Sequence, residues 1–254
     1  MPATFSKELI FKPLGEYGQL IASIFKDLVT KGVSFREFLK QVVLIGYNSF
    51  AIVFLTNIFT GMVLALQTAH GLERFGAKLY VGNIVSLAQV RELGPVLTAI
   101  MLCGRVGAGV AAEIASMVVT EQVDAIKALG ANPIRKLVSP RLVAAIVALP
   151  LLTVMADFIG IIGGGLVAVY ELNLNAHIYY RSIINFVTIT DVMDGVIKSA
   201  AFGFIFVSIA CFKGLHARGG TEGVGKATTE AVVVGSIAIL ISNYFLTKLL
   251  ILFE

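Results

Sequence analysis

Several ionisable side chains lie within runs of apolar residues, where a charge is costly unless it is paired or serves a ligand. They include Arg91, Glu92, Arg105, Glu113, Asp157 and Lys198. Arg91 and Lys198 fall at similar depths in their apolar runs, so together they could bind an anionic head group. Alternatively, Arg91 pairs with Glu92, and Lys198 pairs with Asp194 one helical turn away. The spacing leaves both interpretations open.

Arg105 and Glu113 stand among small residues, which let helices approach one another closely. We expect the two to pair with each other or with a neighbouring helix and so to strengthen packing, the alternative being a direct role in transport. Asp157 has no titratable partner in its own run, which favours a hydrogen-bonded structural role. Gly160 and Gly164 predict a second helix-packing surface.

The segment 219–228, GGTEGVGKAT, nearly matches the phosphate-binding pattern G-x-x-x-x-G-K-[ST]. Ala227 occupies the position whose hydroxyl would bind the metal ion, and the preceding element is an apolar run rather than a strand. We therefore reject nucleotide binding and expect a flexible loop that leads into the last apolar run.

No other grouping suggests catalysis or metal binding. His70, His177 and His216 are expected in different loops and lack metal-ligand spacing. Cys103 and Cys211 lie in apolar runs, where thiols usually pack inertly. We expect no catalytic residue, no metal and no cofactor in this chain.

The amino-acid composition indicates the class of protein in which these side chains lie. Apolar residues make up 57% of the 254 residues, charged residues only 14%, and the mean hydropathy is +0.89. A soluble domain carries about 25% charged residues, so this chain has too little charge to cover a surface that faces water. That excludes a soluble enzyme, a disordered protein and a secreted disulfide scaffold, and it indicates an integral membrane protein.

The apolar runs predict an all-α membrane fold with five spans. The approximate bounds are 42–68, 84–119, 142–170, 193–212 and 229–252. Because about 20 residues suffice to cross a bilayer, the second span should project, tilt, or kink near Gly94 and Pro95.

The distribution of Lys and Arg predicts the orientation of these spans. The three segments on the amino-terminal side of the membrane hold thirteen such residues, and the segments on the other side hold four. Basic residues favour the cytoplasmic side, so we expect the amino terminus inside and the carboxyl terminus outside. The chain then divides into an amino-terminal interfacial region, 1–40, and a permease-like region, 41–254.

The amino-terminal region is amphipathic rather than membrane-spanning. Apolar residues from Leu14 to Val29 recur at helical spacing, which predicts a helix that lies in the interface. Gly32 is expected to end it, and Ser34 with Glu37 forms a capping-box pattern for the next helix. The first residues hold no apolar core long enough for a signal peptide.

A short helix is expected between the second and third spans, at about 121–129. Thr120 suits its N-cap and Gly130 its C-cap. Its apolar stripe consists of Val123, Ile126 and Leu129. The helix could be a simple connector at the interface or a rigid handle that docks into a cytoplasmic partner, and the spacing alone does not decide between these roles.

The sequence from 91 to 141 closely resembles the MlaE-type permeases of ABC transporters that work with MCE proteins. The most specific matches are RELGP at 91–95, GRVGAGVAAEI at 104–114, TEQVDAIKALG at 120–130 and the NP…PR pattern that ends at Arg141. Weaker matches extend the resemblance over about residues 40–252.

This resemblance implies a homodimeric permease in the inner membrane of diderm bacteria. The partners it implies are a cytoplasmic ATPase that holds ATP and Mg, a periplasmic MCE protein and, in some systems, a small cytoplasmic accessory subunit. The cargo would be phospholipid or a related lipid, with no role for nucleic acid. The short helix between the second and third spans would dock the ATPase.

The resemblance also implies roles for individual residues. The lipid pocket would comprise Leu64, Leu72, Phe75, Arg91, Glu92, Leu93 and Lys198. Coupling to the ATPase would involve Glu121, Val123, Asp124, Ile126, Leu129 and Arg135. One competing function is a secondary transporter or channel without a motor, but the intramembrane charges are too sparse for a continuous polar path. Another is a membrane-embedded lipid enzyme, which would need a catalytic grouping that the sequence lacks.

Overall fold

The computed structural model describes residues 15–28 and 32–253, and within these ranges the chain forms helices and connecting turns without a β-strand. Five of its helical stretches are long and apolar enough to cross a membrane. They run over Phe35–Glu73, Lys78–Val119, Ile134–Tyr170, Ile189–Leu215 and Gly220–Phe253. The all-α fold with five spans is therefore confirmed, although each span is longer than its apolar run predicts.

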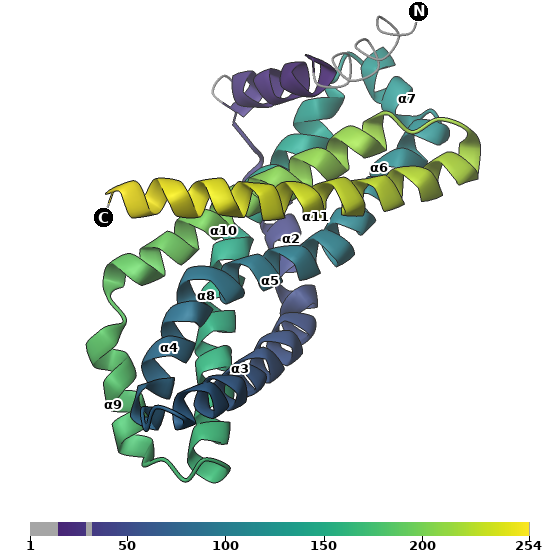
Figure 1. The fold of residues 1–254 in the computed structure, drawn as a ribbon. Coiled ribbons are helices and arrows are strands. Elements are labelled where there is room, and N and C mark those ends of the chain that lie inside the picture. Colours follow the sequence, from purple (N-terminus) through teal and green to yellow (C-terminus); the bar gives the residue numbers. More distant parts are fainter. Residues whose placement is uncertain (1–14, 29–31, 254) are drawn as a thin grey trace, which may run out of the picture.

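Several spans consist of more than one helix. The first contains α2 (Phe35–Gly46) and α3 (Phe50–Glu73). The second contains α4 (Val81–Ala88), α5 (Gly94–Leu102) and α6 (Ala108–Val119). The others contain α8 (Ser139–Tyr170), α10 (Ile189–Leu215) and α11 (Gly220–Phe253). Two short helices, α7 (Gln122–Ala128) and α9 (Ala176–Phe186), lie at opposite ends of the bundle (Figure 1).

The second span is interrupted by π-helical turns at Gln89–Leu93 and Cys103–Gly107. The first turn comes immediately before Gly94 and Pro95, where the sequence predicts a kink. Proline has no N–H to donate and its ring crowds the preceding turn, so the wider π-helical turn accommodates it here. π-helical turns inside α-helices are frequent at functional sites.

The centre of the bundle is α8, which packs against α3, α10 and α2. Its contact with α3 is made by bare backbone, since a Cβ added at Gly61 would overlap the carbonyl oxygen of Gly160. A Cβ added at Gly163 would likewise overlap the carbonyl of Ile58. Small residues allow such close approach between membrane helices, and at these positions no larger residue fits without moving a helix.

The two carboxyl-terminal spans differ in burial. The span of α10 is the most enclosed of the five, with Phe202 and Phe206 fully buried in the core. In contrast, α11 lies across α6 and α10 at the outside of the bundle (Figure 1). Many apolar side chains along its length are exposed. An exposed apolar face is stable in lipid, where water does not penalise it.

Of the local predictions, the amino-terminal helix agrees with the structure and two others are wrong, and one short helix was not predicted. Residues 15–28 form the expected amino-terminal helix, while Leu14 and Val29 lie outside the described residues. The capping box is wrong, since Ser34 precedes α2 without a side-chain cap and Glu37 pairs with Lys40. The predicted flexible loop at 219–228 is wrong, since α11 begins at Gly220. The short helix α9 was not predicted.

Candidate functional site

Two ion pairs connect the second span to α10 near the end of the bundle that holds α9. Arg91 pairs with Asp191, and Lys198 Nζ lies 2.7 Å from Glu92 Oε1. Both cations therefore bind carboxylates on a different helix, so the pairings within one helix, Arg91 with Glu92 and Lys198 with Asp194, are wrong. Charged groups within a membrane usually pair in this way.

Lys198 also compensates for the proline in the second span. Pro95 cannot donate the α-helical hydrogen bond that the carbonyl of Arg91, four residues earlier, would otherwise accept. Lys198 Nζ donates to that carbonyl oxygen at 2.9 Å. Next to it, a Cβ added at Gly195 would lie 2.5 Å from the carbonyl oxygen of Val90. The absent side chain of Gly195 thus brings α10 close enough for Lys198 to reach the kinked turn.

Glu92 joins three spans through its two carboxylate oxygens. In addition to Lys198, it accepts hydrogen bonds from Asn243 Nδ2 at 2.9 Å and from Thr247 Oγ1 at 2.9 Å, both on α11. On α10, Asp191 accepts from Thr188 in a capping box at the helix start. Both carboxylates are thus held in place by several donors, which keeps the two cations in fixed positions.

These charges border a cavity of about 380 Å³ with mainly apolar walls. Its lining includes Ile84, Leu87, Ala88, Phe186, Leu250 and Ile251, together with Arg91, Glu92, Asp194, Lys198 and Thr247. Lys198 is 2% exposed, whereas Arg91 keeps 30% of its side chain accessible. The arrangement resembles a typical small-molecule site, which combines apolar walls with a few placed polar groups.

The other predicted pocket residues do not line this cavity. Leu64 and Leu72 pack against a small cluster that includes Val81 of α4. Phe75 is 82% exposed in the turn after α3, and Leu93 lies half-buried in the π-helical turn. The structure thus brings Arg91, Glu92 and Lys198 together and leaves the remaining four on neighbouring surfaces.

A second polar group is buried between α3, the second span and α8. Gln89 Nε2 donates to Asn57 Oδ1 at 2.9 Å, and both side chains are fully buried. A Cβ added at Gly94 would overlap Asp157 Oδ1, so the carboxyl lies against bare backbone. That oxygen has no hydrogen-bond partner among the described residues, so the expected hydrogen-bonded role of Asp157 is wrong.

Arg105 and Glu113 do not pair with each other. Arg105 Nη1 donates to Ser49 Oγ at 2.9 Å, at the junction between α2 and α3. Glu113 Oε1 lies 2.8 Å from Arg141 Nη2 on α8, and the Arg141 side chain is only 5% exposed. Arg141 was not predicted as the partner, because it lies at the edge of an apolar run and its depth follows only from the packing of α8.

At the opposite end of the bundle, α7 spans the connection between α6 and α8. Glu121 precedes it in a left-handed conformation, φ 59°, and Thr120 donates its hydroxyl to Ser116 O. Thr120 therefore belongs to the end of α6 and is not the N-cap of α7. Gly130, at φ 74°, ends the helix as predicted. The left-handed turn at Glu121 sets the angle between the span and α7.

The predicted apolar stripe of α7 is divided between the core and the surface. Val123 is 5% exposed and packs within the chain, so it is not available to fill a partner's groove. Leu129 is 85% exposed and Ile126 half-buried, while Asp124 pairs with Lys127 at 2.9 Å. Val123 thus packs α7 against the rest of the chain, and the exposed surface of α7 consists of apolar residues beside charged ones.

The sequence of the MlaE permease family matches this chain over residues 38–249. A probable ABC transporter permease protein of Rickettsia typhi is 48% identical over 212 residues, which cover 84% of this chain and 82% of the relative. A protein of the same description from Synechocystis is 41% identical over 231 residues, with coverage of 91% and 88%. The intermembrane phospholipid transport system permease protein MlaE of Haemophilus influenzae is 34% identical over 243 residues, with coverage of 94% and 92%.

Proposed function

The chain belongs to the MlaE permease family, and from this premise we propose that it moves phospholipid or a related lipid between the inner membrane and a periplasmic MCE protein. It is the membrane-spanning subunit, and a separate ATPase supplies the driving energy. The Haemophilus relative carries a name that specifies intermembrane phospholipid transport, which supports this choice of cargo.

The observation that carries the proposal is the cavity bordered by Arg91, Glu92 and Lys198. A phospholipid needs an apolar surface for its acyl chains and a cation for its phosphate. Ile84, Leu87 and Leu250 supply the apolar surface. The accessible part of Arg91 supplies the cation, while Asp191 holds the Arg91 guanidinium in place.

The paired charges also suggest how the lipid is released. Arg91 and Lys198 are each paired with a carboxylate in this structure, so neither cation stands alone in the cavity. A phosphate that enters competes with these carboxylates, and each exchange replaces one ion pair with another. The site therefore binds its cargo without a large gain in affinity, which suits a protein that must let the cargo go.

We place α7 against the ATPase, with ATP and Mg on that partner. Ile126 and Leu129 offer an apolar surface, and Glu121, Asp124 and Arg135 surround it with charge. The excess of Lys and Arg at this end of the bundle favours a cytoplasmic location. The cavity then opens toward the periplasmic side, where the MCE protein receives or delivers lipid.

A homodimer completes the proposal. One chain leaves long apolar faces exposed on α3 and α11, and a second copy would enclose a two-tailed lipid between such faces. Leu64, Leu72 and Phe75 would then approach the cargo from surfaces that a single chain leaves open. Mass measurement of the permease in a lipid disc with its ATPase should give two copies, and a single copy would contradict this part of the proposal.

The experiment that tests the whole proposal is reconstitution with the partners. Purification through a tag on this chain should also recover an ATPase and an MCE protein. The complex in vesicles should transfer labelled phospholipid only when ATP is hydrolysed. Transfer without any ATPase would instead support a secondary transporter or channel, and the absence of both partners would contradict the proposal.

A further inference from the structure

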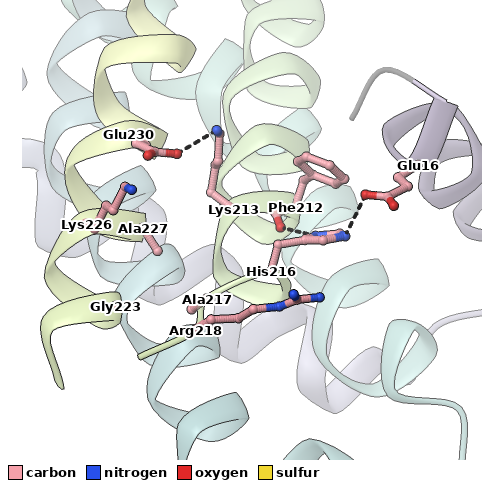
Figure 2. A pocket seen from close by; sticks show the side chains of 10 residues that line it. All are labelled: Glu16, Phe212, Lys213, His216, Ala217, Arg218, Gly223, Lys226, Ala227 and Glu230. Atoms are coloured by element: carbon pink, nitrogen blue, oxygen red, sulfur yellow. Dashed lines mark hydrogen bonds and ion pairs between the residues drawn. The ribbon is translucent and has the colours of Figure 1, made fainter. Parts of the chain in front are cut away.

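A second cavity lies at the α7 end of the bundle, away from the one bordered by Lys198. Figure 2 shows its lining, which comes from the end of α10, the start of α11 and the amino-terminal helix. Its volume is about 330 Å³. It borders the GGTEGVGKAT segment, which the proposed lipid transport does not use.

Two ion pairs balance part of the charge in this cavity. Lys213 Nζ lies 2.7 Å from Glu230 Oε2, which joins α10 to α11. His216 Nε2 lies 3.4 Å from Glu16 Oε2 on the amino-terminal helix. His216 Nδ1 is 2.8 Å from the carbonyl oxygen of Phe212. Both nitrogens of the His216 ring thus lie near oxygen atoms that accept hydrogen bonds.

Two further basic residues, Arg218 and Lys226, line the same cavity. Within the described ranges neither side chain makes a hydrogen bond or a close ion pair (Figure 2), although Lys226 attracts Glu230 through its charge. Lys226 lies one turn from Glu230, but that carboxylate is already bound by Lys213. Apart from His216, the lining holds three basic side chains, Lys213, Arg218 and Lys226, against the two carboxylates of Glu16 and Glu230.

The floor between these cations is lined by small residues. It consists of Ala217, Gly223 and Ala227. A Cβ added at Gly223 would overlap the carbonyl of Arg218, so the backbone that carries Arg218 packs directly on the first turns of α11. This contact fixes the Arg218 backbone, and the Arg218 and Lys226 side chains lie on different sides of the cavity (Figure 2).

The surroundings set the depth of the cavity in the membrane. The amino-terminal helix that supplies Glu16 is amphipathic, and such helices lie at the level of lipid head groups. Its Tyr17 hydroxyl lies 2.6 Å from Ser208 Oγ of α10, which places this helix beside the last turns of that span. The anions concentrated at this depth are the phosphates of phospholipids, and basic pockets between spans bind such head groups.

We propose that Arg218 and Lys226 bind the phosphate of an anionic phospholipid in this cavity, at the opposite end of the bundle from the transport cavity. Arg recognises phosphate through its planar set of donors and Lys as a compact charge. A free phosphate ion has the same chemistry, so the test includes both sources. The site holds a resident lipid and stands apart from the cargo path.

The test compares lipid retention by full-length variants. The protein is extracted from discs of phosphatidylcholine and phosphatidylglycerol in equal amounts, and the retained lipids are counted by native mass spectrometry. The double variant Arg218→Gln/Lys226→Gln should retain at least about tenfold less phosphatidylglycerol, equivalent to ~1.4 kcal/mol. The charge-matched control Arg74→Gln/Arg181→Gln, at the other end, should retain as much as the unmodified chain.

Two further measurements complete the test. The charge-preserving variant Arg218→Lys/Lys226→Arg should keep most of the retained phosphatidylglycerol, which shows that any loss in the first variant is not misfolding. ³¹P NMR measures the line broadening of inorganic phosphate in the presence of each protein. If the unmodified chain broadens the line, Arg218→Gln/Lys226→Gln does not, and the two retain the same lipids, the site binds free phosphate instead of a lipid. Equal lipid retention in all variants with no phosphate binding would overturn the proposal, as would an equal loss in the control.

Discussion

The ammonium group of Lys198 donates to the carbonyl oxygen of Arg91, the residue four positions before Pro95, at 2.9 Å. A side chain on α10 thus replaces the backbone donor that the proline removes from the second span. The same ammonium group pairs with Glu92, so one lysine supports both the kinked turn and the charge balance of the cavity.

Replacing Lys198 should therefore destabilise the protein as well as impair transport. Lys198→Met leaves Glu92 without its cation and the carbonyl of Arg91 without its donor. Loss of one partner from a buried pair costs about 3–5 kcal/mol, and because Glu92 is half-exposed we expect about 2 kcal/mol. Thermal unfolding in detergent measures the change. The double variant Lys198→Met/Glu92→Gln should recover part of the loss, and a Lys198→Met protein as stable as the unmodified chain would contradict this role.

The surface of α7 should be required for binding the ATPase. Ile126→Asp would place an unpaired charge in the contact, which we expect to cost about as much as breaking an interfacial charge pair, roughly 2–5 kcal/mol. Binding should then weaken by a factor of roughly 30 or more. Co-purification of the ATPase and lipid-stimulated ATP hydrolysis report the effect, with Ile126→Leu as the matched control. Unchanged complex and activity would show that α7 is only a connector.

The contact between α8 and the second span should not tolerate a single added methyl group. Gly160→Ala would place its Cβ against the Gln89 side chain, whose Cδ lies 2.6 Å from that position. Overpacking of this kind typically costs about 1–3 kcal/mol. Gly109→Ala is the matched control, because a Cβ there meets no atom within 4 Å. Equal melting temperatures of the two variants would refute the close contact.

The orientation of the bundle can be tested by cysteine labelling. The natural thiols of Cys103 and Cys211 are buried, so they should give little background. A cysteine in place of Lys127 should react with a membrane-impermeant reagent only after the cytoplasmic side is exposed, and a cysteine in place of Arg74 should react in intact cells permeable only at the outer membrane. The reverse pattern would invert the proposed topology.

The spans were predictable from the sequence because apolar length alone decides whether a helix crosses a bilayer. The ends of the spans could not be predicted, because α8 and α11 continue into polar residues that lie outside the apolar runs. α11 starts at Gly220 inside a segment whose glycines predict a loop, and its packing on α10 and α6 outweighs that local preference.

Individual charges in the cavity were identified from their position within apolar runs, but their partners were not. Arg91 and Asp191 are one hundred positions apart in the chain, and no helical spacing relates residues on different helices. The pairing depends on Gly195, whose missing side chain brings α10 against the kinked turn. Val123 was predicted to face a partner because periodicity defines a stripe on a helix but does not show which part of it the chain itself covers.

The backbone contact between Gly61 and Gly160 limits which parts of the permease can move. Where helices touch through main-chain atoms, no side chain can change rotamer to allow sliding, so we expect α3 and α8 to move together. The second span, α10 and α11 are instead joined at Glu92 by an ion pair and two hydrogen bonds, which can break and re-form. If the cavity opens, we therefore expect the contacts of Glu92 to break before the packing of α3 on α8 changes.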